Sequence, residues 1–413
     1  MSHFPQKNGR LHAEGVALEK VAQAVGTPAY VYSAASLRMG FRALDQAFAG
    51  SEHLICYSVK ANSNLAILKL FSDAGSGFDI VSGGELARVL AAGGQPQRTV
   101  FSGVGKTTEE MARALAAGIL LFNVESAEEL FALDAVARKL KKKAPFALRV
   151  NPHVDAKTHR YISTGLKTSK FGVPFAEARA LYRHSRQLKG LVAAGVDCHI
   201  GSQLTESSPV KAALSKVAGL YRQLRGEGHP LRYLDVGGGL GITYRDETPP
   251  SVEEYAMVVT QAARETGATL VLEPGRVLVG NAGLLLTRVL YRKKTPAKRF
   301  LIVDAGMNDL MRPALYEAHH EIQPVVSRKG RTQVMDVVGP VCESTDVLGH
   351  ARRLVVPKAG ALLAVRTAGA YGMSMANNYN SRARPPEVLV DGKAFRVIRA
   401  RETLEDLWRG EAV

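Results

Sequence analysis

Short apolar segments alternate with longer amphipathic ones over much of the chain. Between residues 53 and 277, runs rich in β-branched residues end in polar residues or glycine, and apolar residues at helical spacing follow each run. The eight runs lie at 53–60, 78–84, 99–106, 120–126, 146–152, 191–202, 231–239 and 269–276. This alternation predicts a parallel sheet, and eight units in such a length are typical of a closed (β/α)8 barrel. An open doubly wound α/β sheet is the structural alternative.

The helical spacing fades after residue 280. Short apolar runs separated by turn signals follow at 284–294, 299–306, 331–340, 361–371 and 387–398. The pair Asp391-Gly392 is a hairpin signal, and a further strand at 28–33 could pair with this region. The sequence therefore predicts a mostly antiparallel β domain, a barrel or sandwich that the N-terminal strand joins. We expect an N-terminal segment at 1–34, the barrel at 35–279 and the β domain at 280–413.

Composition narrows the function classes. The chain has 413 residues, of which 46% are apolar, and we find no apolar run long enough to span a membrane and no signal-peptide core at residues 1–15. We therefore expect a cytoplasmic protein. The three cysteines lie far apart and no HExxH pattern occurs, so neither a disulfide framework nor a metal site is expected.

The formal net charge of +16 raises the question of nucleic acid. The densest basic run, residues 139–143, follows an amphipathic pattern and is typical of the solvated end of a helix. No basic patch is interleaved with aromatic residues, so we expect no nucleic-acid partner. A doubly charged anionic substrate and a phosphate cofactor would also suit a positive field.

Candidate catalytic residues are found at the ends of the predicted strands, because barrels of this kind build their active sites there. These ends carry Lys60, Asp79, Ser102, Asn123, Arg149, His199, Gly237–Gly239, Glu273, Gly275 and Arg276. Lys60 closes an apolar strand, where partial desolvation favours a neutral amine that could form a Schiff base. The alternative for Lys60 is a lysine that reaches out to solvent.

Two glycine-containing turns are the candidates for binding a phosphate. GGGLG at 237–241 follows the seventh strand and EPGR at 273–276 ends the eighth, where barrels often bind phosphate. A dinucleotide fingerprint is the competitor, but no early βαβ unit carries the acidic residue that it needs. Glu273 could keep a pyridine nitrogen protonated or pair with Arg276, and His199 could stack on a flat cofactor or be an ordinary core histidine.

The ordered motifs resemble those of one enzyme family. SVKAN at 58–62, FDIVSGGEL at 78–86, HIGSQ at 199–203, GGGLG, EPGR, CESTD at 342–346 and GAYGMSMANNYN at 369–380 are similar to those of diaminopimelate decarboxylases. These are pyridoxal-phosphate enzymes of the alanine racemase-like barrel family, and the resemblance covers nearly the whole chain. It implies removal of carbon dioxide from the D-centre of meso-2,6-diaminopimelate to give L-lysine, the last step of lysine biosynthesis.

The resemblance also implies a role for each matching residue. Lys60 would carry pyridoxal 5'-phosphate, His199 would stack on its ring and Glu273 would pair with the ring nitrogen. The phosphate would be held by the amides of Gly238 and Gly239, the turn at Gly275 and Arg276, and Tyr371. The retained amino-acid head would meet Arg276, Arg312, Tyr316, Glu343 and Tyr371. Cys342 would donate a proton to the carbanion, and the family's Cys342 and Glu343 reach into the partner subunit's site, which implies a homodimer.

Some interpretations stay open on sequence alone. Asp79 matches the cofactor-binding pattern but could instead cap the following helix, and Ser202 is a plausible minor cofactor contact. Segment 152–171 is a candidate active-site lid or an ordinary surface connection. The rival functions are decarboxylation of another basic or D-amino acid (ornithine, lysine or carboxynorspermidine) and a non-catalytic pyridoxal-phosphate carrier. The substrate of a diamine-forming reaction has a bare ammonium group at its far end and brings no second carboxylate to Arg276 and Arg312. Such a reaction is therefore a poor match.

Overall fold

The computed structural model describes residues 4–154 and 170–412, and the chain forms two compact units. The barrel unit comprises Gly40–Ile242 and Thr248–Val277. The β unit comprises Met1–Met39, Thr243–Glu247 and Leu278–Val413. In the described part of the chain, no helix is long and apolar enough to cross a membrane.

Eight parallel strands close into a ring in the described part of the barrel unit. They are β5 (His53–Ser58), β6 (Gly77–Ile80), β7 (Thr99–Phe101), β8 (Leu121–Val124), β9 (Ala144–Asn151), β11 (Leu191–Asp197), β12 (Tyr233–Asp235) and β13 (Thr269–Leu272). Neighbours in the ring follow chain order, and β13 pairs with β5 to close it. The two-residue strand β10 (Val173–Pro174) pairs with β9 outside the ring. The predicted closed barrel is confirmed, and the open sheet was the wrong alternative.

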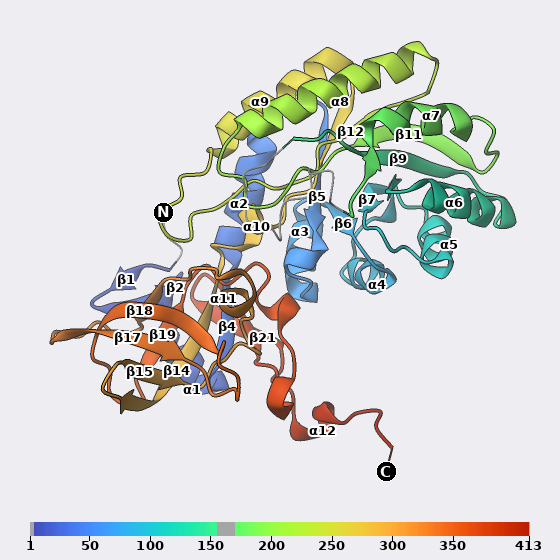
Figure 1. The fold of residues 1–413 in the computed structure, drawn as a ribbon. Coiled ribbons are helices and arrows are strands. Elements are labelled where there is room, and N and C mark those ends of the chain that lie inside the picture. Colours follow the sequence, from blue (N-terminus) through green and yellow to red (C-terminus); the bar gives the residue numbers. More distant parts are fainter. Residues whose placement is uncertain (1–3, 155–169, 413) are drawn as a thin grey trace. The chain divides into compact units, whose positions relative to one another are not determined.

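Amphipathic helices lie outside these strands, as Figure 1 shows. They are α3 (Leu65–Asp73), α4 (Gly83–Ala91), α5 (Thr108–Ala117), α6 (Ala127–Lys139), α7 (Phe175–Ser185), α8 (Ser208–Gly226) and α9 (Val252–Thr266). Local sequence sets their ends: α5 begins at a capping box of Thr107 and Glu110, and it ends at Gly118, whose φ of 76° suits glycine. The basic run at 139–143 lies at the end of α6, as predicted.

The β unit is built on a mostly antiparallel sheet. Its strands are β4 (Ala29–Ser33), β14 (Gly283–Lys294), β15 (Arg299–Val303), β16 (Ile322–Pro324), β17 (Thr332–Val338), β18 (Val347–Val355), β19 (Leu362–Val365), β20 (Glu387–Asp391) and β21 (Ala394–Arg399). The main order is β18-β17-β15-β14-β4-β20-β21, with β19 bridging β14 and β16. Among the described strand pairs of this sheet, only β15–β17 and β4–β20 are parallel.

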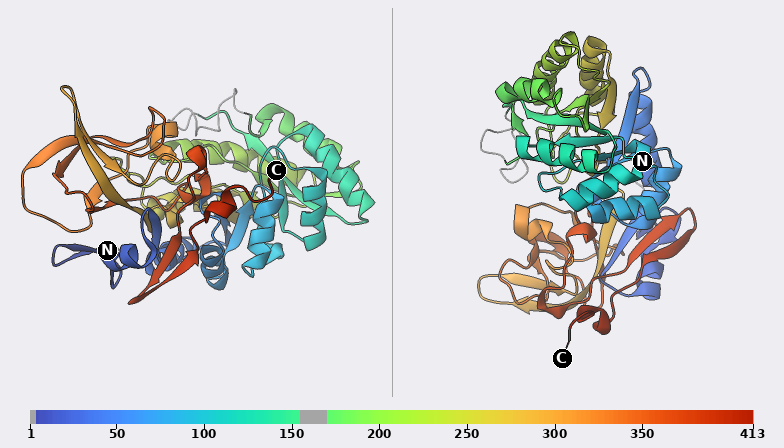
Figure 2. Two further views of the ribbon diagram at one scale, coloured as in Figure 1. Left: turned by 90° about the horizontal axis from the view of Figure 1, so that it is seen from below. Right: turned by 90° about the vertical axis from the view of Figure 1, so that its right-hand side faces the viewer.

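The N-terminal strand β4 lies between β14 and β20, so the prediction that it joins the C-terminal domain is confirmed. The predicted hairpin at Asp391-Gly392 joins β20 to β21, the red pair of strands in Figure 2. The smaller elements are β1 (Gln6–Lys7), β2 (Arg10–Ala13), β3 (Val16–Ala17), α1 (Leu18–Val25), α2 (Ala34–Ala47), α11 (Arg312–Tyr316) and α12 (Leu404–Leu407).

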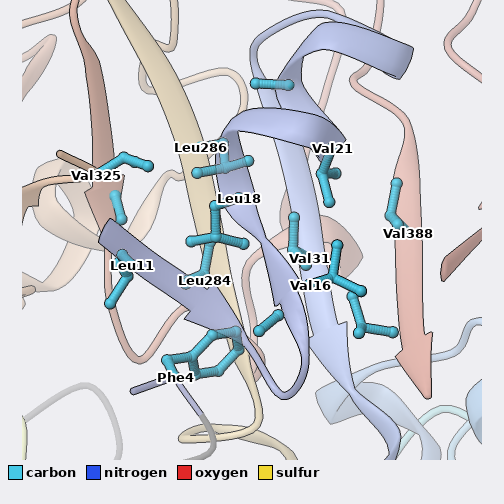
Figure 3. Packing of buried hydrophobic residues seen from close by; sticks show 14 residues of the cluster. Phe4, Leu11, Val16, Leu18, Val21, Val31, Leu284, Leu286, Val325 and Val388 are labelled. Carbon is cyan, nitrogen blue, oxygen red and sulfur yellow. The ribbon is translucent and has the colours of Figure 1, made fainter. Parts of the chain in front are cut away.

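One apolar cluster ties the N-terminal segment to the C-terminal strands of the β unit. Val31 from β4 and Leu284 and Leu286 from β14 pack with Leu18 and Val21 from α1, as Figure 3 shows. All five side chains are fully buried. Burial of each large apolar side chain stabilises the fold by about 1.5–3 kcal/mol, so the described N-terminal residues 4–33 contribute to this core and are not an appendage.

We predict that Leu284→Ala lowers the free energy of unfolding by about 2–5 kcal/mol, because the truncation leaves a cavity in this cluster. Denaturant unfolding followed by circular dichroism measures the change. Leu404→Ala is the matched control, because Leu404 is 64% exposed, and it should shift the midpoint little. Equal shifts for the two variants would contradict the assignment of Leu284 to the core.

Candidate active site

The carboxyl ends of the barrel strands gather the predicted polar residues. Lys60 lies in the 3-10 turn η1 (Val59–Ala61) directly after β5, and Asp79 lies in β6. His199 follows β11, and Glu273 follows β13. Parallel strands in a closed ring all point the same way, so these residues meet at one end of the barrel.

Lys60 and Asp79 form an ion pair, with 2.6 Å between Nζ and Oδ2. Asp79 is fully buried, and its Oδ2 also accepts a hydrogen bond from the Ser58 hydroxyl at 2.7 Å. A carboxylate at this distance stabilises an ammonium group. We predicted a neutral Lys60 amine from desolvation alone, and the Asp79 carboxylate opposes that effect.

Asp79 does not cap the helix that follows β6. The cap of α4 is Ser82, whose hydroxyl accepts from the Glu85 amide at 3.2 Å. The capping alternative for Asp79 was therefore wrong. The second carboxylate oxygen of Asp79, Oδ1, is buried and has no hydrogen-bond partner among the described residues.

Glu273 is held by neutral donors at the barrel end. Its Oε1 accepts hydrogen bonds from the Ser102 hydroxyl at 3.0 Å and from the Asn123 amide at 3.1 Å. Burial, reinforced by the charge of Asp79, raises the pKa of Glu273 to about 7, while Lys60 and Arg149 oppose the shift. Ser102 and Asn123 both end strands, which was the signal that made them candidates.

Two further buried carboxylates, Asp197 and Asp235, lie beside Glu273. Asp235 accepts from the same Asn123 amide at 2.9 Å. Burial raises the pKa of both aspartates well above its usual range, and the charge of Glu273 adds to the rise. The sequence analysis missed them, although each is the acidic last residue of an apolar strand, and that position was the signal available.

A buried arginine also lies at this end of the barrel. Arg149, the buried guanidinium in β9, lies 3.1 Å from a Glu125 oxygen. Burial opposes the charged form of Arg149, but Glu125 and Asp197 raise its pKa. Together with Lys60 it offsets part of the negative charge around Glu273.

His199 is joined to the glycine turn after β12. Its Nδ1 accepts the Gly238 amide hydrogen at 3.1 Å, so the proton of the neutral ring lies on Nε2. Burial, with the charges of Arg149 and Lys60, holds the pKa of His199 well below its usual range. The imidazole at this position is therefore neutral near pH 7.

The two predicted phosphate turns lie at the ends of neighbouring strands, β12 and β13. A Cβ at position 238 would come within 2.1 Å of the Glu273 carbonyl oxygen, so only glycine fits. Gly239 has a φ of 105°, which also favours glycine. Arg276 begins α10 (Arg276–Val279) and donates from Nη2 to the Ser202 hydroxyl at 3.0 Å, which brings two predicted residues together.

The remaining predicted residues belong to the β unit. Arg312 and Tyr316 begin and end α11, and Arg312 is buried. Cys342 and Glu343 lie in the exposed loop between β17 and β18, where the Cys342 amide donates to Asn380 Oδ1 at 2.7 Å. Tyr371 follows β19 and has a φ of 55°.

Two further observations concern the described residues only. No group of three or more histidine, cysteine or acidic residues among them could hold a metal ion. The candidate lid at 152–171 lies mostly outside the described residues, since 155–169 are not among them.

Comparison with known proteins assigns the family. Residues 34–280 match the family model for the pyridoxal-binding domain of pyridoxal-dependent decarboxylases. A diaminopimelate decarboxylase from Pseudomonas aeruginosa is 53% identical over 413 residues, covering 100% of this chain and 99% of the relative. The chain belongs to the diaminopimelate decarboxylases.

Solved structures of this family share the fold over nearly the whole chain. Diaminopimelate decarboxylase from M. jannaschii in complex with L-lysine matches with a TM-score of 0.94 at 39% identity, covering 99% of this chain and 97% of that one. The Helicobacter pylori enzyme, also complexed with L-lysine, matches with a TM-score of 0.92 at 45% identity, covering 95% and 98%. As a pyridoxal-dependent decarboxylase, the chain uses pyridoxal 5'-phosphate as its cofactor.

The barrel end fits this cofactor. Diaminopimelate decarboxylases need a partner for the ring nitrogen, and here Glu273, Asp197 and Asp235 form a buried acidic group that a protonated ring nitrogen would offset. The Asp79 Oδ1 atom is buried and unsatisfied by the described residues. The turn after β12 has glycine at positions 237, 238 and 239, so no Cβ there would block the approach of a phosphate to the backbone.

We predict that Glu273→Gln stabilises the cofactor-free protein increasingly as the pH rises. A folded pKa of about 7, above the usual 4.5, means that the folded state holds the proton more tightly, so Glu273 reduces stability progressively between pH 4.5 and 7. The variant cannot ionise, and its gain in unfolding free energy should grow by about 2 kcal/mol from pH 5 to pH 8. Denaturant unfolding at several pH values measures the gain.

Glu402→Gln is the control for this series. Burial opposes ionisation of Glu402, but hydrogen bonds from Arg384 and Asn378 lower its pKa to about 2. Its stabilising contribution is complete above pH 4.5 and is lost only as the pH falls toward 2, so the variant should differ from the parent by a constant amount from pH 5 to pH 8. If the difference in unfolding free energy between Glu273→Gln and the parent also stays constant from pH 5 to pH 8, the raised pKa of Glu273 is contradicted.

Proposed function

We propose that this chain removes carbon dioxide from the D-centre of meso-2,6-diaminopimelate and releases L-lysine. The observation that carries the proposal is the placement of Glu273, a buried acid with a raised pKa, at the barrel end that also holds Lys60 and the two glycine turns. The substrate is supported by relatives named diaminopimelate decarboxylase and by the family structures complexed with L-lysine.

In this proposal the barrel residues hold the cofactor. Lys60 would bind it through Nζ, with Asp79 fixing the lysine side chain. Glu273 would hold a proton at the ring nitrogen, and the neutral His199 ring would lie against the cofactor ring. When bound, pyridoxal phosphate supplies an electron sink for the pair released as the carbon–carboxylate bond breaks.

The phosphate would be bound at the two glycine turns. The proposed donors are the Gly239 amide, the Gly275–Arg276 turn and the Tyr371 hydroxyl, with Ser202 contributing through its contact with Arg276. The single hydrogen of the Gly238 amide is donated to His199, so we assign Gly238 to orienting the imidazole and leave the phosphate to the other donors. Backbone amides in glycine turns approach anions closely because no Cβ intervenes.

The second amino-acid head of the substrate would be held by charges of both signs. Arg276, Arg312 and Tyr316 would bind the retained carboxylate, and Glu343 would take the distal ammonium. Cys342 would supply the final proton: its S–H bond breaks, the proton goes to the carbon that lost carbon dioxide, and solvent restores the thiol. This role requires a reduced thiol and therefore supports a cytoplasmic location.

We further propose a homodimer in which Cys342 and Glu343 complete the site of the partner subunit. Both residues are exposed, on the loop between β17 and β18. In an isologous dimer a two-fold axis relates the subunits, so each subunit contributes the same loop to the site of the other.

We predict that borohydride reduction of the holoenzyme followed by peptide mapping labels Lys60. We also predict that the enzyme releases carbon dioxide and L-lysine in equal amounts from meso-diaminopimelate. Ornithine and lysine should release little, because neither brings a second carboxylate to the arginines. Lys106 is the internal control, since its side chain is 0% exposed whereas that of Lys60 is 37% exposed, although both pair with a carboxylate. Label on Lys106 would overturn the cofactor assignment, and faster release from ornithine would overturn the substrate.

The dimer proposal predicts complementation between inactive subunits. Lys60→Ala and Cys342→Ala should each abolish most activity alone, because one lacks the cofactor anchor and the other the proton donor. Random mixing of the two should restore about a quarter of parental activity, because half the dimers are hybrids and each hybrid keeps one intact site. Mixing two Lys60→Ala preparations is the control, and no recovery in the hybrid mixture would contradict a shared site.

A further inference from the structure

We propose that His320 is a positioning residue that fixes Arg312 through a neutral acceptor nitrogen and thereby sets the affinity for the carboxylate that the substrate retains. The inference rests on the proposed role of Arg312 in the function above. His320 has no place in that reaction, and the sequence analysis did not single it out. All the contacts that carry the proposal lie within the β unit.

A local chain reversal brings His320 back to Arg312. The short helix α11 begins at Arg312 and ends at Tyr316, and the next residue, Glu317, adopts a left-handed φ of 52°. The chain then turns back over the first residue of the helix, and the Ala318 amide donates to the Arg312 carbonyl at 3.3 Å. His320 Nε2 comes to lie 2.9 Å from Arg312 Nη1.

The second ring nitrogen of His320 decides its tautomer. Nδ1 lies 2.9 Å from the carbonyl oxygen of Arg366, and a carbonyl can only accept, so the ring hydrogen lies on Nδ1. The lone pair of Nε2 is therefore directed at the Arg312 guanidinium, which donates to it. His320 is fully buried, and burial together with the charge of Arg312 lowers its pKa to about 3. The ring remains a neutral acceptor near pH 7.

The ring of Tyr244 packs against the face of the Arg312 guanidinium. The guanidinium carbon of Arg312 lies 4.4 Å from the Tyr244 ring centroid. The same tyrosine ring meets His320 edge-on, with centroids 5.4 Å apart and an interplanar angle of 78°. Arg312 is thus held at one edge by His320 and on one face by Tyr244.

This restraint matters for recognition of a carboxylate. An arginine side chain has several rotatable bonds, and ordering them on binding reduces affinity. A guanidinium that is already oriented can form paired hydrogen bonds with a carboxylate at a smaller entropic cost. Because that carboxylate is bound alike before and during the reaction, loss of the restraint should raise KM and leave kcat nearly unchanged.

Two amide substitutions separate the two ring nitrogens of His320. In His320→Asn the side-chain amide can take the place of Nδ1 and donate to the Arg366 carbonyl, but it cannot accept from Arg312. In His320→Gln the longer side chain can place its oxygen where Nε2 lies and accept from Arg312. We expect His320→Asn to raise KM for meso-diaminopimelate about 10-fold and His320→Gln to raise it less than about 3-fold.

Binding of L-lysine to the holoenzyme gives a second readout, because lysine keeps the same carboxylate. Its dissociation constant should rise about 10-fold in His320→Asn and change little in His320→Gln. A purely structural role would lower the melting temperature and kcat in both variants without separating their KM values. Equal KM values for the two variants would overturn the inference.

The face contact provides a test that leaves His320 intact. Tyr244→Leu removes the ring over Arg312, whereas Tyr244→Phe keeps it. KM should rise more in the leucine than in the phenylalanine variant, with kcat maintained. If His320→Asn does not fold, Tyr244→Leu and Tyr244→Phe test the restraint of Arg312 in its place. Identical KM values for these two variants would contradict the restraint.

Arg312→Ala distinguishes failure of this inference from failure of the proposed function. A parent enzyme that does not decarboxylate meso-diaminopimelate would overturn both. A parent that does so, with no rise in KM for Arg312→Ala, would overturn the role of Arg312 and the inference with it. A rise in KM for Arg312→Ala but not for His320→Asn would overturn the positioning role alone and leave the proposed function standing.

Discussion

The pairing of the last barrel strand with the first determines where the barrel groups of the candidate site lie. β13 runs parallel to β5 in a register that sets Leu272 opposite Ile55, so the residues after both strands emerge side by side. The Ser58 amide binds the Pro274 carbonyl, and the Ser58 hydroxyl bridges Asp79 and the Glu273 carbonyl. Without this closure, a lysine and a glutamate more than 200 residues apart would have no common site.

Closure also places acidic groups where water cannot solvate them. Asp197, Asp235 and Glu273 are all buried at one end of the barrel, and burial together with their mutual repulsion raises the pKa of each carboxyl group. The same arrangement that destabilises the empty site creates a field suited to a cationic ring nitrogen. The same side chains thus lower the stability of the cofactor-free chain and favour the binding of pyridoxal phosphate.

The β unit uses a different means to orient a charge. Arg312 is buried in a unit whose core is apolar, and a neutral histidine and an aromatic face restrain it. A carboxylate in the place of His320 would compete with the substrate for the guanidinium, whereas an imidazole lone pair orients it and leaves the positive charge available. The barrel therefore gathers buried acidic groups that we assign to the cofactor, and the β unit orients a guanidinium that we assign to the substrate.

The order of strands and helices, the closed barrel and the entry of residues 29–33 into the C-terminal sheet could all be predicted from the sequence, because hydrophobic periodicity reports directly which residues must be buried. Strand-end position also selected Lys60, Glu273 and His199. Tertiary structure decided the long-range partners: His199 binds Gly238, and Asp197 and Asp235 join Glu273. Hydrogen bonds and pKa shifts depend on which strands become neighbours and on how much water is excluded, and neither is a property of any local segment of the chain.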